Sequence, residues 1–252
     1  MKYLYRLYQL LIGVPVIILV TIVTAIEVGV GTTIGNGHFW GYYPGRWWAW
    51  IILRTLLIPV TVEGREHLEK NQSYVFVANH QGAFDIFLIY GFLGRNFKWM
   101  MKRQIQKIPF VGYACRKSHQ IMVDKRGVSK IKKTYDDARR ILEQGYSVTV
   151  FPEGARTFTG HMGLFRKGAF ALADELQLPV VPLTINGSFD ILPRMRDWHF
   201  VSWHPLRLTI HQPIYPVGQG AENVNATMRQ AYDSVMSGLV PEYQGFVENL
   251  DQ

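Results

Sequence analysis

Short apolar runs recur along the chain after residue 62, and their composition predicts β-strands. Residues 74–78, 147–151 and 179–185 are rich in Val, Ile, Phe, Tyr or Thr, whereas residues 206–210 alternate apolar and polar positions. Continuous apolar runs of this length are typical of strands buried on both faces, and alternation indicates a strand with one exposed face. We therefore predict a central sheet built from these segments.

Apolar residues at helical spacing predict helices between the strands. In residues 129–144 the apolar side chains recur at that spacing, and Gly145 supplies a stop. Residues 168–176 form a second segment of this kind. Strands that alternate with helices are typical of an α/β domain, so we predict a largely parallel central sheet flanked by helices.

The first 60 residues follow a different pattern, which predicts a membrane anchor. Residues 7–26 contain no charged side chain, a run of about 20 residues, which is the length a helix needs to cross a hydrocarbon core. Residues 39–60 mix Trp and Tyr with arginines, a composition that favours the headgroup level over a full crossing. The glycine-rich residues 29–37 between them predict a turn.

We therefore expect two parts in the chain. Residues 1–60 would form a helix–turn–helix anchor that dips into one leaflet, with a true crossing by the first helix as the alternative. Residues 61–252 would form the α/β domain, because the composition changes near residue 62.

The charge balance favours an anionic partner. Lys and Arg number 27 against 19 Asp and Glu, for a formal net charge of +8. Such an excess suits a phospholipid surface, a phosphorylated substrate, an acidic protein or nucleic acid. The aromatic residues concentrate in the apolar N-terminal third, which argues against nucleic acid. The single cysteine, Cys115, excludes an intrachain disulfide and indicates a reducing compartment.

A polar turn, Asn-His-Gln-Gly-Ala-Phe-Asp at residues 79–85, directly follows the strand at residues 74–78. Such a turn places side chains at the carboxyl edge of the sheet, where open α/β sheets bind ligands. His80 and Asp85 meet there if the histidine lies in the turn and the aspartate in the first turn of the next helix. The carboxylate would then fix the histidine tautomer, and the histidine would accept a proton. A capping aspartate beside an ordinary surface histidine is the alternative.

A second turn, Phe-Pro-Glu-Gly-Ala-Arg-Thr at residues 151–157, also follows a predicted strand. It would present Arg156 at the same edge, where a guanidinium group matches phosphate oxygens. An exposed turn that happens to carry an arginine is the alternative.

Two further segments add cations. Residues 102–112 run from basic to apolar to turn-forming, so that Lys102 is a candidate second phosphate ligand or part of a basic edge that touches lipid headgroups. Arg166 and Lys167 stand at the start of a predicted helix. Positive charge is unfavourable at a helix N-terminus, and an anionic ligand would relieve it.

Taken together and in order, these segments resemble the lysophosphatidate acyltransferases, the 1-acyl-glycerol-3-phosphate O-acyltransferase family. The resemblance spans roughly residues 60–215. The family's four blocks are Asn-His-x-x-x-x-Asp, a lysine segment leading to Ile-Pro-x-x-Gly, Phe-Pro-Glu-Gly-Thr-Arg-Ser and an apolar Val-Pro strand. The first block matches Asn79, His80 and Asp85, and the second matches Lys102, Ile108, Pro109 and Gly112. The third matches residues 151–157, and the fourth matches Val181 and Pro182. Ala155 replaces the usual Thr, and Gln104-Ile105 replaces Glu-Leu.

The resemblance implies an α/β acyltransferase domain behind an N-terminal helical pair. It implies transfer of an acyl chain from acyl carrier protein or acyl-CoA to the 2-hydroxyl of lysophosphatidic acid, which gives phosphatidic acid. It implies that His80 is the general base, that Asp85 orients it, that Lys102 and Arg156 clamp the phosphate, and that Glu153 and Gly154 shape the pocket. No metal or bound cofactor is implied, because the thioester is a co-substrate.

The partners expected on this basis are a phospholipid membrane, lysophosphatidic acid and a carrier-protein or CoA thioester, with no nucleic acid. The expected location is a membrane, the inner membrane of a bacterium with the catalytic domain in the cytoplasm. Two alternatives stay open: acylation of another lyso-lipid, such as a lyso-ornithine lipid, and a catalytically silent, membrane-anchored lipid-binding protein.

Overall fold

A seven-stranded sheet forms the centre of the computed structural model, which describes residues 2–124, 127–194 and 199–247. The strand order is β1-β7-β6-β2-β5-β3-β4, and within the described residues every neighbouring pair is parallel except β6 and β7. The strands are β1 (Val60–Glu63), β2 (Val75–Ala78), β3 (Phe97–Lys102), β4 (Ile121–Val123), β5 (Ser147–Val150), β6 (Val180–Asn186) and β7 (Leu206–Ile210).

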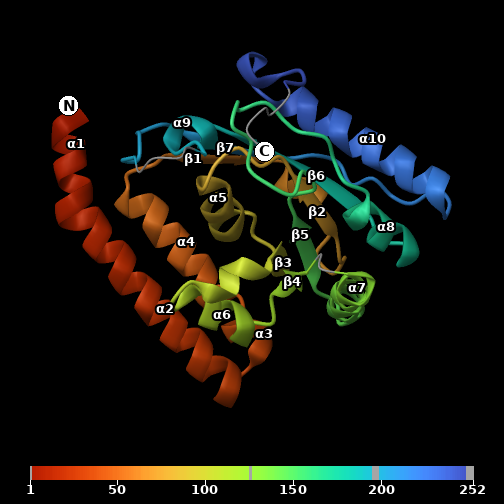
Figure 1. Cartoon of the computed structure of the whole chain (residues 1–252), viewed down its shortest axis with the longest axis horizontal. Helices are drawn as coiled ribbons and strands as arrows, with labels where there is room; N and C mark the ends of the chain where they lie inside the picture. Colours follow the sequence, from red (N-terminus) through yellow and green to blue (C-terminus); the bar gives the residue numbers. More distant parts are fainter. Residues whose placement is uncertain (1, 125–126, 195–198, 248–252) are drawn as a thin grey trace.

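Helices cover both faces of the sheet, and Figure 1 shows α4 and α5 on one side and α7, α8 and α10 on the other. Their bounds are α4 (Tyr43–Thr55), α5 (Phe84–Phe92), α7 (Val128–Glu143), α8 (Gly168–Glu175) and α10 (Ala221–Gly238). Central strand β2 serves both cores: Phe76 packs in the cluster that includes α4 and α5, and Val75 and Val77 pack in the other. The predicted α/β class, with a largely parallel sheet flanked by helices, is confirmed.

The four predicted strands form as β2, β5, β6 and β7, and the two predicted helices form as α7 and α8. Strands β1, β3 and β4 were not predicted. β3 reads Phe-Lys-Trp-Met-Met-Lys, with lysines that interrupt its apolar pattern, and β4 has only 3 residues. Shorter elements complete the described chain: 3-10 turns η2 (Arg65–His67), η3 (Arg103–Lys107) and η4 (Pro241–Tyr243), and helices α6 (Val111–Lys117) and α9 (Ser188–Ile191).

The N-terminal segment is one long helix along the flank of the domain (Figure 1), composed of α1 (Lys2–Tyr8), a π-helical turn (Gln9–Gly13) and α2 (Val14–Ile34). It is the one helix in the described chain that is long and apolar enough, by length and composition, to cross a membrane.

The turn predicted at residues 29–37 starts later than expected, because the helix continues through Ile34. Gly29 and Gly31 are helical, and a Cβ on them would meet the rings of Tyr113 and Trp40. These glycines therefore serve close packing against neighbouring rings and do not form a turn.

The second apolar stretch does not form a matching anchor helix. It forms α3 (Gly37–Trp40) and α4, and α4 buries Ala49, Ile52 and Leu53. The last two belong to the core cluster shared with α5 and the sheet. The expected pair of anchor helices is therefore corrected to one, because a helix rich in aromatic residues can serve a protein core as well as a membrane surface. The division of the chain at residue 60 stays a prediction.

Candidate active site

His80 and Asp85 are in direct contact. β2 ends at Ala78, His80 lies in the following turn, and Asp85 is in the first turn of α5. His80 Nδ1 is 2.7 Å from Asp85 Oδ2, which also accepts a hydrogen bond of 3.0 Å from the N–H of Gly82. The side chain of Asp85 is 0% exposed and that of His80 is 15% exposed. The predicted geometry of the pair is therefore present, with a buried carboxylate behind a histidine that reaches the surface.

The backbone on either side of His80 is held firmly. Asn79 joins the end of β2 to β6: the N–H of Ile185 donates to Asn79 Oδ1 at 2.8 Å, and Asn79 Nδ2 donates to the Ile185 carbonyl at 2.9 Å. The N–H of Thr157 donates to the His80 carbonyl at 3.0 Å. Both predicted turns thus lie side by side at the carboxyl edge of the sheet, hereafter the His80 edge.

The imidazole ring is fixed by stacking as well as by hydrogen bonding. It lies over the ring of Phe151 with centroids 3.8 Å apart and an interplanar angle of 8°. Phe151 in turn stacks on Trp99 at 5.5 Å. When Nδ1–H donates to Asp85, Nε2 is the nitrogen that can accept a proton from a substrate.

Glu153 connects the two turns and does not act as an exposed acid. Its Oε1 accepts from the N–H of His80 at 2.6 Å, and its Oε2 accepts from the N–H of Gly163 at 2.7 Å. Burial raises the pKa of Glu153 to about 8, and the two N–H donors act in the opposite direction. Because both oxygens act as acceptors, the ionised form fits this geometry best.

Gly154 allows a close approach within the second turn. Its φ is +81°, which favours glycine, and a Cβ there would lie 3.2 Å from the guanidinium of Arg166. Of the two residues expected to shape the pocket, Glu153 therefore holds the backbone of the turns, and Gly154 makes room for a cation.

Four cations lie in or near the turn at residues 151–157 and act on one another. Burial lowers the pKa of Lys102, and the charges of Arg194, Arg166 and Arg156 lower it further. Arg194 donates to the carbonyl of Arg156 at 3.0 Å. Like charges at close quarters oppose one another, so an anion among them would be strongly favoured. We call Lys102, Arg156, Arg166 and Arg194 the cation cluster.

Arg194 is the member of this cluster that the sequence analysis missed. No motif surrounds it, and it comes close because a β-bridge joins Pro193 to Gly82, inside the His80 turn. Its guanidinium also lies 4.0 Å from the ring centroid of Phe158. Arg166, singled out only as a cation at a helix start, joins the site because its N–H donates to the Pro152 carbonyl.

The arrangement provides a proton acceptor, a buried carboxylate and a cluster of positive charges. Among the described residues, no group of three or more His, Cys, Asp or Glu side chains is placed to hold a metal ion. Such a site is suited to deprotonating the hydroxyl of a ligand whose anionic group binds the cations.

Comparison with known proteins identifies the family. The family model described as Acyltransferase matches residues 59–186, which include both turns. The chain is 30% identical over 195 residues to 1-acyl-sn-glycerol-3-phosphate acyltransferase alpha of Mus musculus, covering 74% of this chain and 68% of that protein. It is 32% identical over 157 residues to a chloroplastic 1-acyl-sn-glycerol-3-phosphate acyltransferase of Arabidopsis thaliana, covering 62% of this chain and 44% of that protein.

The chain spans about half the length of three curated relatives that it matches, from Brassica napus, Arabidopsis thaliana and Chlamydomonas reinhardtii. Among solved structures, the 1-acyl-sn-glycerophosphate acyltransferase PlsC from Thermotoga maritima superposes with a TM-score of 0.77. The match covers 94% of this chain and 93% of that one at 24% identity, which supports the fold. The family model matches half of this chain, and the alignment with the mouse relative covers 68% of that protein. This chain therefore belongs to the acyltransferase family, as its motifs predicted.

Proposed function

We propose that the chain is a 1-acyl-sn-glycerol-3-phosphate O-acyltransferase. It transfers an acyl group from an acyl-carrier-protein or acyl-CoA thioester to the 2-hydroxyl of lysophosphatidic acid, giving phosphatidic acid and the free thiol. The observation that carries this proposal is the His80–Asp85 pair, 2.7 Å apart, beside the cation cluster. The acceptor of this reaction carries both groups that such a site would recognise, a hydroxyl and a phosphate.

The proposed chemistry uses His80 as a general base. Nε2 takes the proton of the acceptor hydroxyl as the oxygen attacks the thioester carbonyl carbon. The C–S bond then breaks, and the imidazolium returns the proton to the departing thiolate. Asp85, buried behind the ring, stabilises the imidazolium and keeps Nε2 directed outward. The nucleophile is the acceptor itself, so no serine or cysteine ester is needed.

The cation cluster would orient the acceptor. A phosphate bound among Lys102, Arg156 and Arg194 fixes one end of a small molecule and so restricts the positions open to its hydroxyl. Burial lowers the pKa of Arg156, and the charge of Asp85 opposes this shift, so Arg156 links the two halves of the site.

We further propose that the N-terminal helix lies in one leaflet and does not cross the bilayer. It is held to the domain at both ends: Tyr5 and Tyr8 donate to backbone carbonyls at the end of α4, and Lys117 donates to Thr33 at 3.4 Å. A crossing would carry one of these contacts to the far side of the membrane. The outward face is apolar, with Leu4, Leu7, Leu11, Ile18, Leu19, Ile26, Val30 and Ile34 exposed.

Neighbouring elements extend this apolar face. Trp47 and Trp50 of α4 are exposed, as are Ile108, Phe110 and Tyr113 around α6. Aromatic rings with a polar atom favour the headgroup level of a bilayer. With the single cysteine as support for a reducing compartment, we place the enzyme on the cytoplasmic side of a bacterial inner membrane.

The decisive assay supplies purified full-length protein with labelled acyl donors and a panel of acceptors. Lysophosphatidic acid should be acylated efficiently, and its phosphate-free counterpart poorly, because only the former can use the cation cluster. Efficient acylation of a phosphate-free lyso-lipid would instead assign another acceptor. The absence of turnover with every donor and acceptor, while lipids still bind, would favour a lipid-binding protein.

A further inference from the structure

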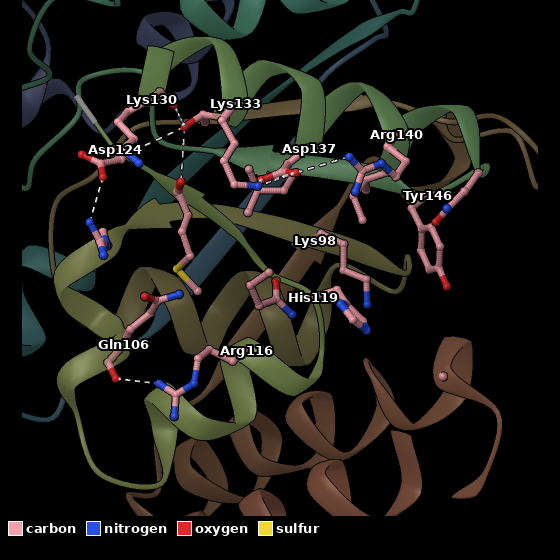
Figure 2. A pocket seen from close by; sticks show the side chains of 18 of the residues that line it. Lys98, Gln106, Arg116, His119, Asp124, Lys130, Lys133, Asp137, Arg140 and Tyr146 are labelled. Carbon is pink, nitrogen blue, oxygen red and sulfur yellow. Dashed lines mark hydrogen bonds and ion pairs between the residues drawn. The ribbon is translucent and has the colours of Figure 1, made fainter. Parts of the chain in front are cut away.

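A second positively charged site lies along the edge of the sheet, away from His80. A cavity of about 720 Å³ is lined by residues of β3 and β4, and Figure 2 shows α7 above these residues and α6 below them. Neither His80 nor Asp85 lines it. Its volume falls within the range typical of small-molecule sites, about 300–1,000 Å³.

Cations from four elements line this cavity. They come from β3, η3, α6 and α7 and define what we call the basic trough: Lys98, Arg103, Arg116, Lys130, Lys133 and Arg140. Two acidic residues, Asp124 and Asp137, are the carboxylates in the lining. Asp124 pairs with Arg103 at 3.0 Å, and Asp137 lies 3.1 Å from Lys133 and 3.6 Å from Arg140. Six cations against two carboxylates leave a surplus of positive charge, which indicates an anionic ligand.

Lys98 is the clearest indication that this cavity binds an anion. The residue is 3% exposed, and among the described residues its ammonium makes one hydrogen bond, of 3.3 Å, to the carbonyl of Gly41. Burial lowers the pKa of Lys98 to about 8. A buried ammonium without a carboxylate is costly, and an anion in the trough would supply its counter-charge.

The two ends of the trough differ. At the amino end of β3 and β5, Tyr146 stacks with His38 at a centroid distance of 5.0 Å, and Lys98 lies over the Tyr146 ring, also at 5.0 Å. Both rings line the cavity. At the opposite end, Arg103 directly follows Lys102, a member of the cation cluster. The trough therefore runs from an aromatic end to the His80 edge, past a row of cations.

We infer that the basic trough binds the nucleotide-phosphate part of a coenzyme A thioester, the acyl donor. The purine would stack on the exposed ring of His38, which itself stacks on Tyr146. The phosphates would meet Lys98 and the cations of α7, and the thioester arm would leave past Arg103 toward the His80 edge. Base–aromatic stacking and phosphate–cation pairing are the interactions such a ligand offers. This inference rests on the proposed acyl transfer and names its donor.

The shape of the trough favours this donor over the two other anionic partners. A carrier protein would meet the exposed cations of η3, α6 and α7 but would leave the buried Lys98 and the aromatic end without a partner. A lipid headgroup would use the cations but would leave the aromatic end without a partner. Both are outcomes of the test below.

Helix α7 offers a matched control. Lys130 and Lys133 line the cavity, whereas Lys132, on the same helix and also exposed, does not. We expect Lys130→Ala/Lys133→Ala to raise the KM for an acyl-CoA donor by roughly tenfold or more, since each charged contact is substantial. The KM for the lysophosphatidate acceptor and the kcat should change little. Lys132→Ala should behave as wild type.

Binding should show the same selectivity. In calorimetry with the full-length protein in detergent, free coenzyme A should bind to wild type and to Lys132→Ala, and more weakly to Lys130→Ala/Lys133→Ala. Pantetheine, which lacks every phosphate and the purine, should bind poorly to all three. Equal coenzyme A affinity in the double variant and Lys132→Ala would refute the inference.

Two other results would reassign the trough. A double variant that loses use of acyl-carrier-protein donors but keeps the KM for acyl-CoA would make the trough a carrier-protein surface. One that loses binding to phosphatidylglycerol-containing vesicles, with acyl-CoA use unchanged, would make it a headgroup site. The proposed function can fail separately. If the protein binds coenzyme A through Lys130 and Lys133 but acylates no lyso-lipid, the coenzyme A site is supported and the proposed reaction is refuted.

Discussion

The His80 edge and the basic trough are both rich in positive charge, yet they are built differently. At the His80 edge the key groups are locked: Asp85 is fully buried, His80 is stacked and hydrogen-bonded, and Glu153 holds two backbone N–H groups. In the trough, apart from Lys98, the cations are long, exposed side chains of two helices, α6 and α7, and of the 3-10 turn η3.

This difference indicates what each region can contribute to catalysis or to binding. Locked groups keep their geometry during a reaction and can stabilise charge as it develops. Exposed lysines and arginines reorganise at little cost and contribute affinity, and they are screened by salt. We therefore expect changes at the His80 edge to affect turnover, and changes in the trough to affect use of the donor.

The largest effect should follow from removing the base. His80→Ala should lower kcat by roughly 10² to 10⁴, the usual contribution of a general base, while binding to liposomes stays intact. Steady-state kinetics and liposome flotation measure the two properties. A variant that keeps a tenth of wild-type turnover would rule out His80 as the base. Asp85→Asn should also lower kcat, because an amide cannot stabilise an imidazolium as a carboxylate does.

A smaller loss is expected from the cation cluster, and it should depend on the acceptor. Arg156→Ala, Lys102→Ala and Arg194→Ala should each remove a charge-assisted contact of roughly 1.5 to 3 kcal/mol, or about a 10- to 150-fold loss of kcat/KM for a phosphorylated acceptor. The KM for the donor should stay nearly constant. Arg156→Lys should recover part of the loss, because lysine keeps the charge without the planar fork.

The acceptor without a phosphate is the control for the cation cluster. Its acylation, already weak, should be insensitive to the three alanine substitutions. Equal losses with both acceptors would mean that these residues do not hold the phosphate, and the assignment of the substrate would have to be reopened.

The affinity of the basic trough for the donor should depend on pH. The pKa of Lys98 is lowered by burial to about 8, so its positive charge is present below pH 8 and lost above it. Donor affinity should therefore fall as the pH rises from about 7 to 9, with the KM for acyl-CoA increasing roughly five- to tenfold as the protonated fraction declines.

Lys98→Met tests this assignment, because it removes the titrating group. Tyr146, which Lys98 overlies, His38, which stacks on Tyr146, and His119 in the lining are titratable groups that the test must separate from Lys98. Burial raises the pKa of Tyr146, so the phenol stays neutral over this range. The pH dependence of the donor KM should flatten in Lys98→Met. An unchanged profile in this variant would assign the titration elsewhere.

Salt should give the smallest effect and the sharpest contrast. Raising the ionic strength from about 0.1 to 1 M shortens the Debye length from about 10 to 3 Å. The exposed cations of the trough should attract the donor phosphates less strongly, so the donor KM should rise a few-fold. The kcat depends on the His80–Asp85 pair and should stay nearly constant. A kcat that falls in parallel with donor affinity would mean that the two regions are not separate.

Much of the His80 edge could be predicted from sequence because each part is local. The His80–Asp85 contact needs one strand, one turn and the first turn of one helix, all within residues 75–92. Lys102 and Arg156 each lie at or just beyond the end of a strand, and parallel strands bring their carboxyl ends to one edge whatever their order. The roles of these residues in catalysis stay proposals.

The rest of the site depended on contacts between distant segments. Arg194 reaches the cluster through the bridge between Pro193 and Gly82, and no pattern in the sequence indicates that pairing. The aromatic stretch that became α4 was ambiguous for a related reason: an apolar helix face looks alike whether it meets lipid or a core. Its position against α5 resolved the choice.

The sequence by itself determined the α/β class, the paired turns and the long apolar helix, because strand, helix and turn patterns are set by neighbours along the chain. The tertiary structure alone decided the basic trough, whose walls come from segments spread from residue 37 to residue 146. Its cations are unremarkable one by one. They become a site only because β3, β4, α6 and α7 pack so that the charges face one cavity, and packing is a property of the whole fold.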